Sequence, residues 1–178
     1  MRVHQLQRAP GRGFSLIEFT VVLVIIGIIA AILLDRIKFY QEQAEKATME
    51  ATAAAIQAGL HLRIAGYLAA GKSGSEVEGL ARQNPIDWLA RKPDNYAGAF
   101  DRIGADELPA GTWYFDLSDG TLVYRIRYGH AFVTENEGPR EVRYRARVEY
   151  GRLENDSGLI GLRVAEFAPM HPYHWLTQ

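Results

Sequence analysis

FSLIEFTVVLVIIGIIAAILL, residues 14–34, is the stretch that decides the fold of this chain. It is almost wholly apolar and about as long as the 20 or so residues with which one helix crosses a bilayer. Glu18 is its only charged residue, and a carboxylate inside hydrocarbon costs about 2.5–3.5 kcal/mol on insertion scales. The stretch therefore predicts a membrane-spanning helix whose single carboxylate takes its cation from outside the segment or from another molecule.

The residues around this carboxylate carry a resemblance. The run Arg12-Gly13-Phe14-Ser15-Leu16-Ile17-Glu18 resembles the processing site of type IV prepilins and type II secretion pseudopilins. The resemblance implies that a prepilin peptidase cuts between Gly13 and Phe14 and methylates the new amino terminus on Phe14. It also implies that Glu18 neutralises the terminal ammonium of a neighbouring subunit during assembly. It covers residues 1–35, and beyond them only the layout of the chain is similar.

Electrostatics favours the same interpretation independently. A new amino terminus at Phe14 is a cation close in membrane depth to Glu18. Two unit charges about 4 Å apart attract by roughly 4 kcal/mol at an effective dielectric constant near 20, which is comparable with the cost of burying the carboxylate. A staggered neighbour supplies such an ammonium more easily than the helix's own end does. The alternative is a carboxylate at headgroup level that has no partner.

The charges before the apolar run predict how the chain is oriented. Residues 1–13 hold Arg2, Arg8 and Arg12 and no acid. By the positive-inside rule, this end stays in the cytoplasm of a bacterial cell and the C-terminal part crosses the inner membrane to the periplasm. A conventional signal peptide cut near Ala30-Ala31 is the alternative, but the apolar run is long for one.

Composition bounds the remainder. A chain of 178 residues suits one domain plus an anchor. The net charge of −1 favours neither nucleic acid nor an acidic partner. There are no cysteines, whereas many members of the resembled family close a C-terminal loop with a cysteine pair. Hydrogen bonds, packing or a bound ion must close the loops of this chain.

The helix is predicted to continue past the apolar run. Residues 35–68 contain no proline and are rich in good helix formers. One apolar stripe recurs at steps of three and four, namely Met49, Ala53, Ile56, Leu60, Ile64 and Tyr67. The part of the helix below the stripe is expected to be more exposed to water, because it contains Gln41, Glu42, Glu45, Lys46 and Glu50. We expect one helix over residues 14–69, with its membrane and assembly half at 14–34 and its amphipathic half at 35–70.

After the helix, the sequence predicts a connecting region at residues 71–111 and a β-sheet head with a tail at 112–178. In the connecting region we expect a short helix at 76–81, a capped turn at 84–89 and a loop at 92–98. Period-two patterns predict strands at 112–117, 121–128, 142–150 and 161–167, with a hairpin turn at 118–120. The tail, 169–178, packs on an edge or stays loose. The fold class is α+β, with an antiparallel sheet packed on the helix, as in pilins.

Five arginines share the outward parity of two expected strands and form a possible partner surface: Arg125, Arg127, Arg143, Arg145 and Arg147. The alternative, which we favour, is a solvated sheet face that Glu141, Glu149 and Asp116 partly neutralise. The tyrosines of these strands fall on the opposite parity, so stacking on single-stranded nucleic acid is poorly supported. A nucleic-acid partner is not expected.

Metal and catalytic signals are weak. Residues 154–158 form an oxygen-rich turn in which Asn155 and Asp156 are calcium candidates, although such turns are common without metal. The pair His171 and His174 has no cysteine or acid at ligand spacing. No nucleophile–base arrangement or phosphate loop is present, so we expect no cofactor and no enzyme activity.

The sequence therefore predicts a structural subunit of a type IV pilus or of a type II secretion pseudopilus, which its N-terminal helix packs into a fibre. Its expected partners are the prepilin peptidase, other pilin or pseudopilin subunits and the inner membrane. The sequence does not separate the two machines. The alternative is a single-pass inner-membrane protein that does not polymerise and has a ligand- or DNA-binding periplasmic head.

Overall fold

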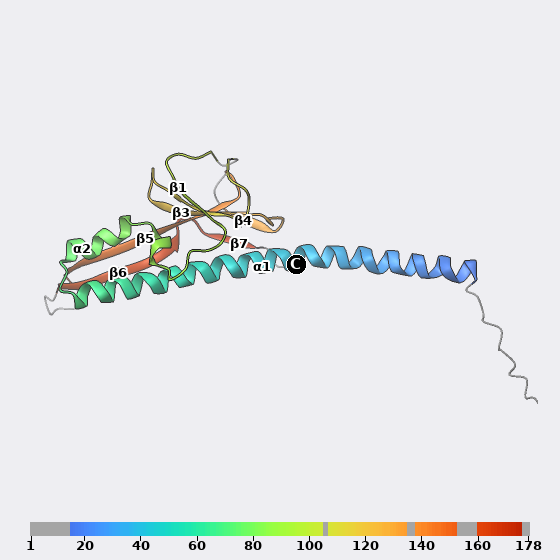
Figure 1. The fold of residues 1–178 in the computed structure, drawn as a ribbon, viewed down its shortest axis with the longest axis horizontal. Coiled ribbons are helices and arrows are strands. Elements are labelled where there is room, and N and C mark those ends of the chain that lie inside the picture. The colour runs from blue at the N-terminus through green and yellow to red at the C-terminus, as the bar shows by residue number, and fades with distance from the viewer. Residues whose placement is uncertain (1–14, 105–106, 135–137, 153–159, 176–178) are drawn as a thin grey trace, which may run out of the picture. The chain divides into compact units, whose positions relative to one another are not determined.

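The computed structural model describes residues 15–104, 107–134, 138–152 and 160–175 (Figure 1). The chain divides into two compact units between Tyr40 and Gln41. The first contains the N-terminal part of one long helix, and the second, which we call the head, contains the remaining elements. Each unit is described by itself below.

A single helix, α1 (Leu16–Ala69), spans the boundary between the units. The sequence predicted one helix over 14–69, and this is confirmed from Leu16 to Ala69, while residue 14 lies outside the described residues. The absence of proline from α1 leaves its backbone hydrogen-bond ladder intact. At its end, Gly71 adopts φ +71°, the left-handed conformation that glycine tolerates best. The amide of Lys72 then donates to the carbonyl of Tyr67, which satisfies an orphan carbonyl of the last turn.

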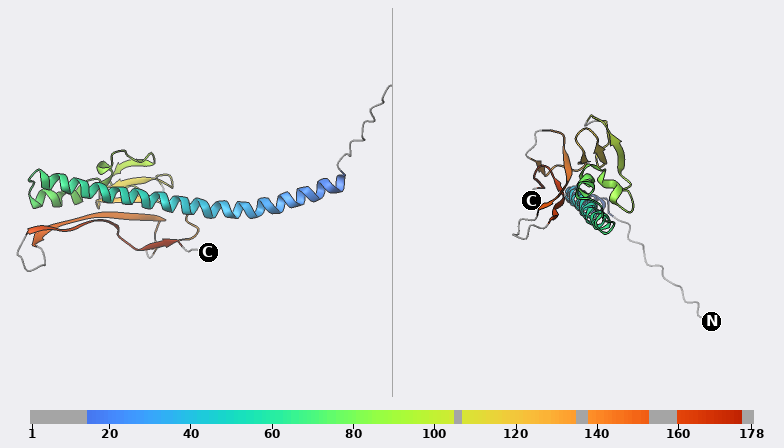
Figure 2. Two further views of the ribbon diagram at one scale, coloured as in Figure 1. Left: turned by 90° about the horizontal axis from the view of Figure 1, so that it is seen from below. Right: turned by 90° about the vertical axis from the view of Figure 1, so that its left-hand side faces the viewer.

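The apolar stripe of α1 forms the helical side of the head's core. Met49, Ile56 and Leu60 are completely buried, and Ile64 nearly so. Ala53 and Tyr67 are partly buried against the same cluster, so every member of the predicted stripe faces the sheet. In Figure 2, β5 and β6 run alongside this part of the helix. The period of 3.6 residues thus identified the packed face correctly.

The head contains a five-stranded sheet in the order β1-β2-β3-β5-β6. Its strands are β1 (Tyr96–Phe100), β2 (Trp113–Asp116), β3 (Thr121–Arg125), β5 (Glu141–Arg152) and β6 (Ile160–Pro169). The pairs β2–β3, β3–β5 and β5–β6 are antiparallel. The alternating positions of β5 from Val142 to Val148 face the core, as predicted.

The hairpin between β2 and β3 forms where the sequence placed it. Gly120 turns the chain with φ +70°, and its amide donates to the carbonyl of Asp116 at 2.9 Å. The carboxylate of Asp119 accepts from both the amide and the hydroxyl of Thr121, at 3.0 and 2.6 Å. Local side-chain bonds of this kind are what make Ser-Asp-Gly a turn sequence.

Three strands were not expected. Part of the predicted loop 92–98 is wrong, because β1 begins at Tyr96 and pairs parallel to β2. The long connection from β1 to β2 allows this parallel pairing. A second, two-stranded sheet joins β4 (Phe132–Thr134) to β7 (Tyr173–Trp175) in the tail. A strand of three residues is too short to show a period of two in its sequence. Such strands are therefore recognised only from their packing in the folded chain.

The connecting region contains three short helices, α2 (Gly74–Glu78), η1 (Gly79–Arg82) and η2 (Pro85–Trp88). Ser73 and Glu76 form a capping box that starts α2, and Asn84 caps η2. The expected short helix and capped turn are therefore confirmed. Trp88 is buried, and Gly59 of α1 allows this close approach: a Cβ on Gly59 would lie 3.0 Å from the carbonyl oxygen of Trp88.

The outer edge of β6 is covered by the side chain of Gln57 from α1. Its amide nitrogen donates to the carbonyl of Ala165 at 3.0 Å, and its amide oxygen accepts from the amide of Phe167. The ring of His61, one turn along the helix, lies 3.3 Å from the same carbonyl. The helix therefore satisfies edge groups of the sheet as well as packing on its face.

Candidate functional site

The first described turn of α1 holds the predicted assembly carboxylate. The hydroxyl of Ser15 accepts from the amide of Ile17 at 3.3 Å, and the carbonyl of Ser15 accepts from the amide of Phe19 at 3.0 Å. Ser15 thus caps the helix start, and Glu18 lies in the first turn, where the helix dipole favours a negative charge. Glu18 is exposed and forms no ion pair with a described residue. It therefore remains available to a cation from outside the described chain.

The side chains around this carboxylate form an uncovered apolar surface. The large apolar residues from Leu16 to Leu34 are 40–84% exposed, and they lie on all sides of the helix. The helix is long and apolar enough to cross a membrane, and nothing of its most apolar window is buried within the protein. A helix that is apolar all round requires lipid or other helices around it, so this surface has no role in the fold of the single chain.

Two predicted sites fall outside the described residues. Gly13 and Phe14, the predicted processing site, precede the first described residue, Ser15. The calcium candidates Asn155 and Asp156 lie in the segment 153–159, which is also outside. Both remain predictions. Among the described residues, no group of three or more potential metal ligands is close enough to hold an ion.

The structure does not gather the five arginines into one basic surface. Arg127 lies beyond the end of β3, which stops at Arg125 rather than at the predicted residue 128. Its guanidinium donates twice to the carbonyl of Ala110, at 2.9 and 3.0 Å. Arg125 is half-buried opposite Glu141. Arg145 donates to the carbonyl of Asp119 at 3.3 Å, while Arg147 pairs with Glu149 at 2.6 Å.

Arg143 is the most strongly neutralised of the five. It forms ion pairs of 2.8–3.1 Å with Asp116, Asp119 and Glu141. Burial lowers the pKa of its guanidinium, but the carboxylates of Glu141 and Asp116 outweigh this effect and raise the pKa. Burial, together with the charge of Glu141, also raises the pKa of Tyr114 to about 12. A cluster with more carboxylates than cations supports the solvated-face alternative, whereas a partner surface there remains an untested prediction.

Two glutamates that the sequence pattern assigned to a wet stretch are buried. Glu42 and Glu45 retain only 5% and 8% of their exposure. Glu45 accepts from the hydroxyl of Tyr124 at 3.0 Å and from the amides of Arg127 and Tyr128 at 2.7 and 2.6 Å. The carboxylate of Glu42 accepts from the amide of His130 at 2.6 Å. We call these two side chains the glutamate clasp. The clasp accepts hydrogen bonds from backbone amides that have no acceptor in a neighbouring strand. β3 therefore ends earlier than predicted.

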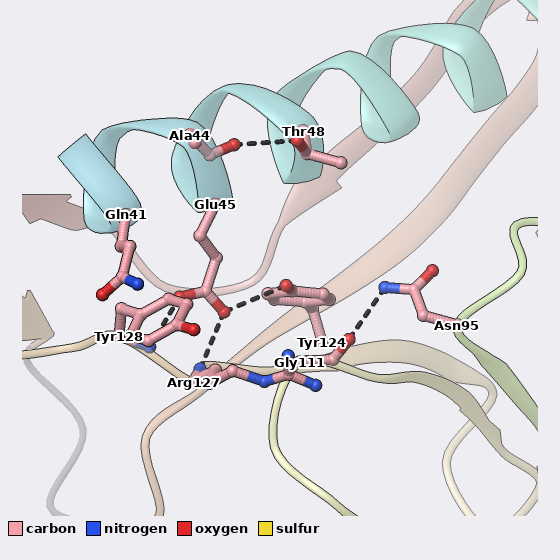
Figure 3. Close-up of a pocket in the computed structure, with 9 residues that line it drawn as sticks. All are labelled: Gln41, Ala44, Glu45, Thr48, Asn95, Gly111, Tyr124, Arg127 and Tyr128. Atoms are coloured by element: carbon pink, nitrogen blue, oxygen red, sulfur yellow. Dashed lines mark hydrogen bonds between the residues drawn. The ribbon is translucent and has the colours of Figure 1, made fainter. Parts of the chain in front are cut away.

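A hollow opens beside the glutamate clasp. It has a volume of about 350 Å³, and we call it the α1–β3 hollow. It is lined by Gln41, Ala44, Glu45, Thr48, Asn95, Gly111, Tyr124, Arg127 and Tyr128. Figure 3 shows the rings of Tyr124 and Tyr128 facing the helix, with Glu45 bonded to the amides below them. No sequence pattern indicates this hollow, because its wall comes from four separate segments of the head.

The comparisons with known proteins concern the N-terminal part of the chain. The model of the prokaryotic N-terminal methylation motif matches residues 9–34. The type IV narrow pilus major component PilA5 of Thermus thermophilus is 48% identical over 46 residues, which are 26% of this chain and 40% of that protein. The chain thus spans well under half the length of this curated relative. No solved structure matches.

The matched motif includes the predicted processing site, the assembly carboxylate and the exposed apolar surface, and the head has the α+β architecture predicted with them. The resemblance inferred from residues 12–18 is confirmed. The chain therefore carries the prokaryotic N-terminal methylation motif over residues 9–34, and its N-terminal part is similar to that of a type IV pilus component.

Proposed function

We propose that this protein is a structural subunit of a type IV pilus or a type II secretion pseudopilus. In this proposal a prepilin peptidase cuts after Gly13, and the new terminal residue, Phe14, is methylated. The mature subunit waits in the inner membrane of a bacterium with its head in the periplasm, and then enters a fibre. The name of the Thermus relative, a pilus major component, favours a pilus.

The observation that carries the proposal is the state of Glu18 in the single chain. It is the only charge of the run from residue 14 to 34, it lies in the first turn of α1, and it forms no ion pair with a described residue. A bundle of such helices in a fibre buries this carboxylate, and a neighbour's terminal ammonium compensates it. At about 4 Å the attraction is roughly 4 kcal/mol at an effective dielectric constant near 20, enough to offset an insertion cost of about 2.5–3.5 kcal/mol.

Assembly then explains why the apolar surface of α1 is larger than the fold of the head requires. Before assembly, lipid surrounds residues 16–34. In the fibre, equivalent helices of other copies replace the lipid, and dispersion contacts between them replace contacts with acyl chains. No chemistry on a substrate is needed for this role, and the family is typically structural rather than enzymatic.

Mass spectrometry of the membrane-extracted protein tests the processing step. We expect a chain that begins at N-methylated Phe14. A chain that begins at Met1 would contradict the proposal because it has no terminal ammonium at the level of Glu18, and a chain that begins near Ala31 would contradict it because it lacks Glu18 altogether.

Substitution of the carboxylate tests assembly. Glu18→Ala should remain folded and inserted in the membrane but should lose fibres, because the ammonium of each neighbour would be buried without a partner. Glu18→Asp, which keeps the charge on a shorter side chain, should retain part of the fibre yield. Normal fibre yield in Glu18→Ala would favour the alternative of a membrane-anchored protein that does not polymerise.

A further inference from the structure

We propose that residues 36–40 of α1, which we call the headgroup segment, bind the phosphate groups of anionic phospholipids in the periplasmic leaflet of the membrane. The inference rests on the membrane-anchored stage of the proposed function, in which residues 16–34 span the lipid. It adds a charged contact with lipid to a helix whose other lipid contacts are apolar.

The length of the apolar run places the headgroup segment at the surface of the bilayer. The run from Leu16 to Leu34 belongs to one unbroken helix, so it rises about 27 Å at 1.5 Å per residue. The hydrocarbon core of a typical bilayer is about 30 Å thick. The residues that follow Leu34 therefore lie at the level of the lipid phosphates.

Two cations, Arg36 and Lys38, lie at this level. Both are exposed, and neither forms an ion pair with a described residue. One acid, Asp35, adjoins them in the sequence, so residues 35–40 keep a net positive charge. Basic residues are usually enriched at the opposite, cytoplasmic end of a span. Arg36 and Lys38 run against this trend, and a phosphate partner at their own end gives them a role.

Two aromatic residues follow the cations. Phe39 and Tyr40 are 38% and 66% exposed, and their ring centroids lie 5.8 Å apart. Tyrosine concentrates at membrane interfaces because its ring is apolar while its hydroxyl stays among polar groups. Rings at this position hold the helix at one depth, which keeps the two cations level with the phosphates.

Lipid surrounds the helix on every side at this level. Contact with phosphates therefore does not depend on which way Arg36 and Lys38 point around the helix axis. Their apolar stems lie along the hydrocarbon boundary while their charges stay in polar surroundings. A guanidinium also donates two parallel hydrogen bonds to one phosphate. The segment therefore favours anionic headgroups over zwitterionic ones, in which an amine already neutralises the phosphate.

Electron spin resonance of spin-labelled lipids tests the proposal on the full-length protein in phosphatidylcholine vesicles. Lipids that touch the protein move slowly, and the slow fractions of labelled phosphatidylglycerol and phosphatidylcholine give the preference for the anionic headgroup. One basic residue near an anionic surface strengthens binding roughly fivefold. Two are lost in Arg36→Gln/Lys38→Gln, but only some of the lipids around the helix touch them. We expect the averaged preference to fall by roughly fivefold.

The matched control is Arg91→Gln/Lys92→Gln, which removes two exposed cations from the head and should leave the preference unchanged. The exchange Arg36→Lys/Lys38→Arg keeps the charge and should keep most of the preference. The arginines of residues 1–13 are the same in all these variants, so the differences report on the headgroup segment. An equal preference in the wild type and in Arg36→Gln/Lys38→Gln, or an equal loss in the control, would overturn the proposal.

A second measurement decides the matter if Arg36→Gln/Lys38→Gln does not insert into vesicles. The variant Arg2→Gln/Arg8→Gln/Arg12→Gln removes the cations at the other end of the apolar run and leaves the headgroup segment intact. Its preference for phosphatidylglycerol should persist at low salt and fall as salt screens the charges. A variant without this preference, or with one that salt does not change, would overturn the proposal.

These measurements require neither processing nor fibres. Loss of the lipid preference would overturn the headgroup segment and leave the proposed function standing. A chain that begins at Met1 in cells would overturn the proposed function, whereas the lipid preference measured in vesicles would be unaffected.

Discussion

Removal of the Glu45 carboxylate should destabilise the head more than any exposed substitution on α1. Glu45→Ala leaves three donors without an acceptor, namely the hydroxyl of Tyr124 and the amides of Arg127 and Tyr128. A buried donor without a partner costs about 1–3 kcal/mol. The two amides belong to an exposed and a half-buried residue, so water compensates them in part and the low end of that range applies. Three such losses sum to about 3 kcal/mol of unfolding free energy.

The measurement is a urea titration of the detergent-solubilised protein, followed by tryptophan fluorescence. All three tryptophans lie in the head, at positions 88, 113 and 175, so the signal reports on the head alone. Glu45→Gln, which keeps one acceptor oxygen, should lose an intermediate amount. Glu50→Ala removes an exposed glutamate from the same helix and should stay within about 0.5 kcal/mol of the wild type. Equal midpoints for Glu45→Ala and Glu50→Ala would refute the role assigned to the clasp.

Two further predictions concern the head. Gly59→Ala should lower the free energy of unfolding by about 1–3 kcal/mol, because its new Cβ would lie 3.0 and 3.1 Å from backbone and side-chain atoms of Trp88. Gly66→Ala, whose Cβ meets nothing within 4 Å, should instead raise the free energy of unfolding by about 0.5–1 kcal/mol. Thermal denaturation of the two variants distinguishes these outcomes. Burial opposes ionisation of Asp116, but bonds from Ser118 and Arg143 outweigh it and hold the pKa of this carboxyl below 3.8. The ionised form therefore stabilises the fold at neutral pH, and this contribution disappears as the pH falls through the lowered pKa. Asp116→Asn should be less stable at pH 7 but lose less stability on acidification below pH 3.8, and parallel slopes of unfolding free energy against pH would contradict this assignment.

The sequence correctly predicted those helices and strands in which the pattern of apolar residues repeats often enough to be recognised. The stripe from Met49 to Tyr67 spans several turns, so its buried face was unambiguous. The same stripe, extended backwards from Met49 by four and seven residues, reaches Glu45 and Glu42. Their positions on the stripe therefore implied that they are buried, but their charged side chains led to the prediction of a solvent-exposed stretch. Charged residues are rarely buried without partners, and their partners are backbone amides that no sequence pattern displays.

The remaining differences arise from contacts between distant segments. The arginine positions of β5 were assigned to the correct face, yet Arg143 is neutralised there by carboxylates from three separate positions of the chain. The parallel strand β1 was hidden in the segment Tyr-Ala-Gly-Ala-Phe, which has little β-branched character. In the same way, β4 and β7 pair across about forty residues, and only the folded chain brings them together.

The cover that Gln57 gives to the edge of β6 has a consequence for how copies of the head can associate. Under the proposed function, many subunits lie close together in one membrane, and at high local concentration open sheet edges can join into amyloid-like stacks. With Gln57 occupying both polar groups between Ala165 and Phe167, one side of the sheet offers no template there. At the other side, β1 is broken by a register shift and by Gly98 with φ +124°. Both features discourage association of copies through their sheet edges, which is consistent with the proposed assembly through the N-terminal helices.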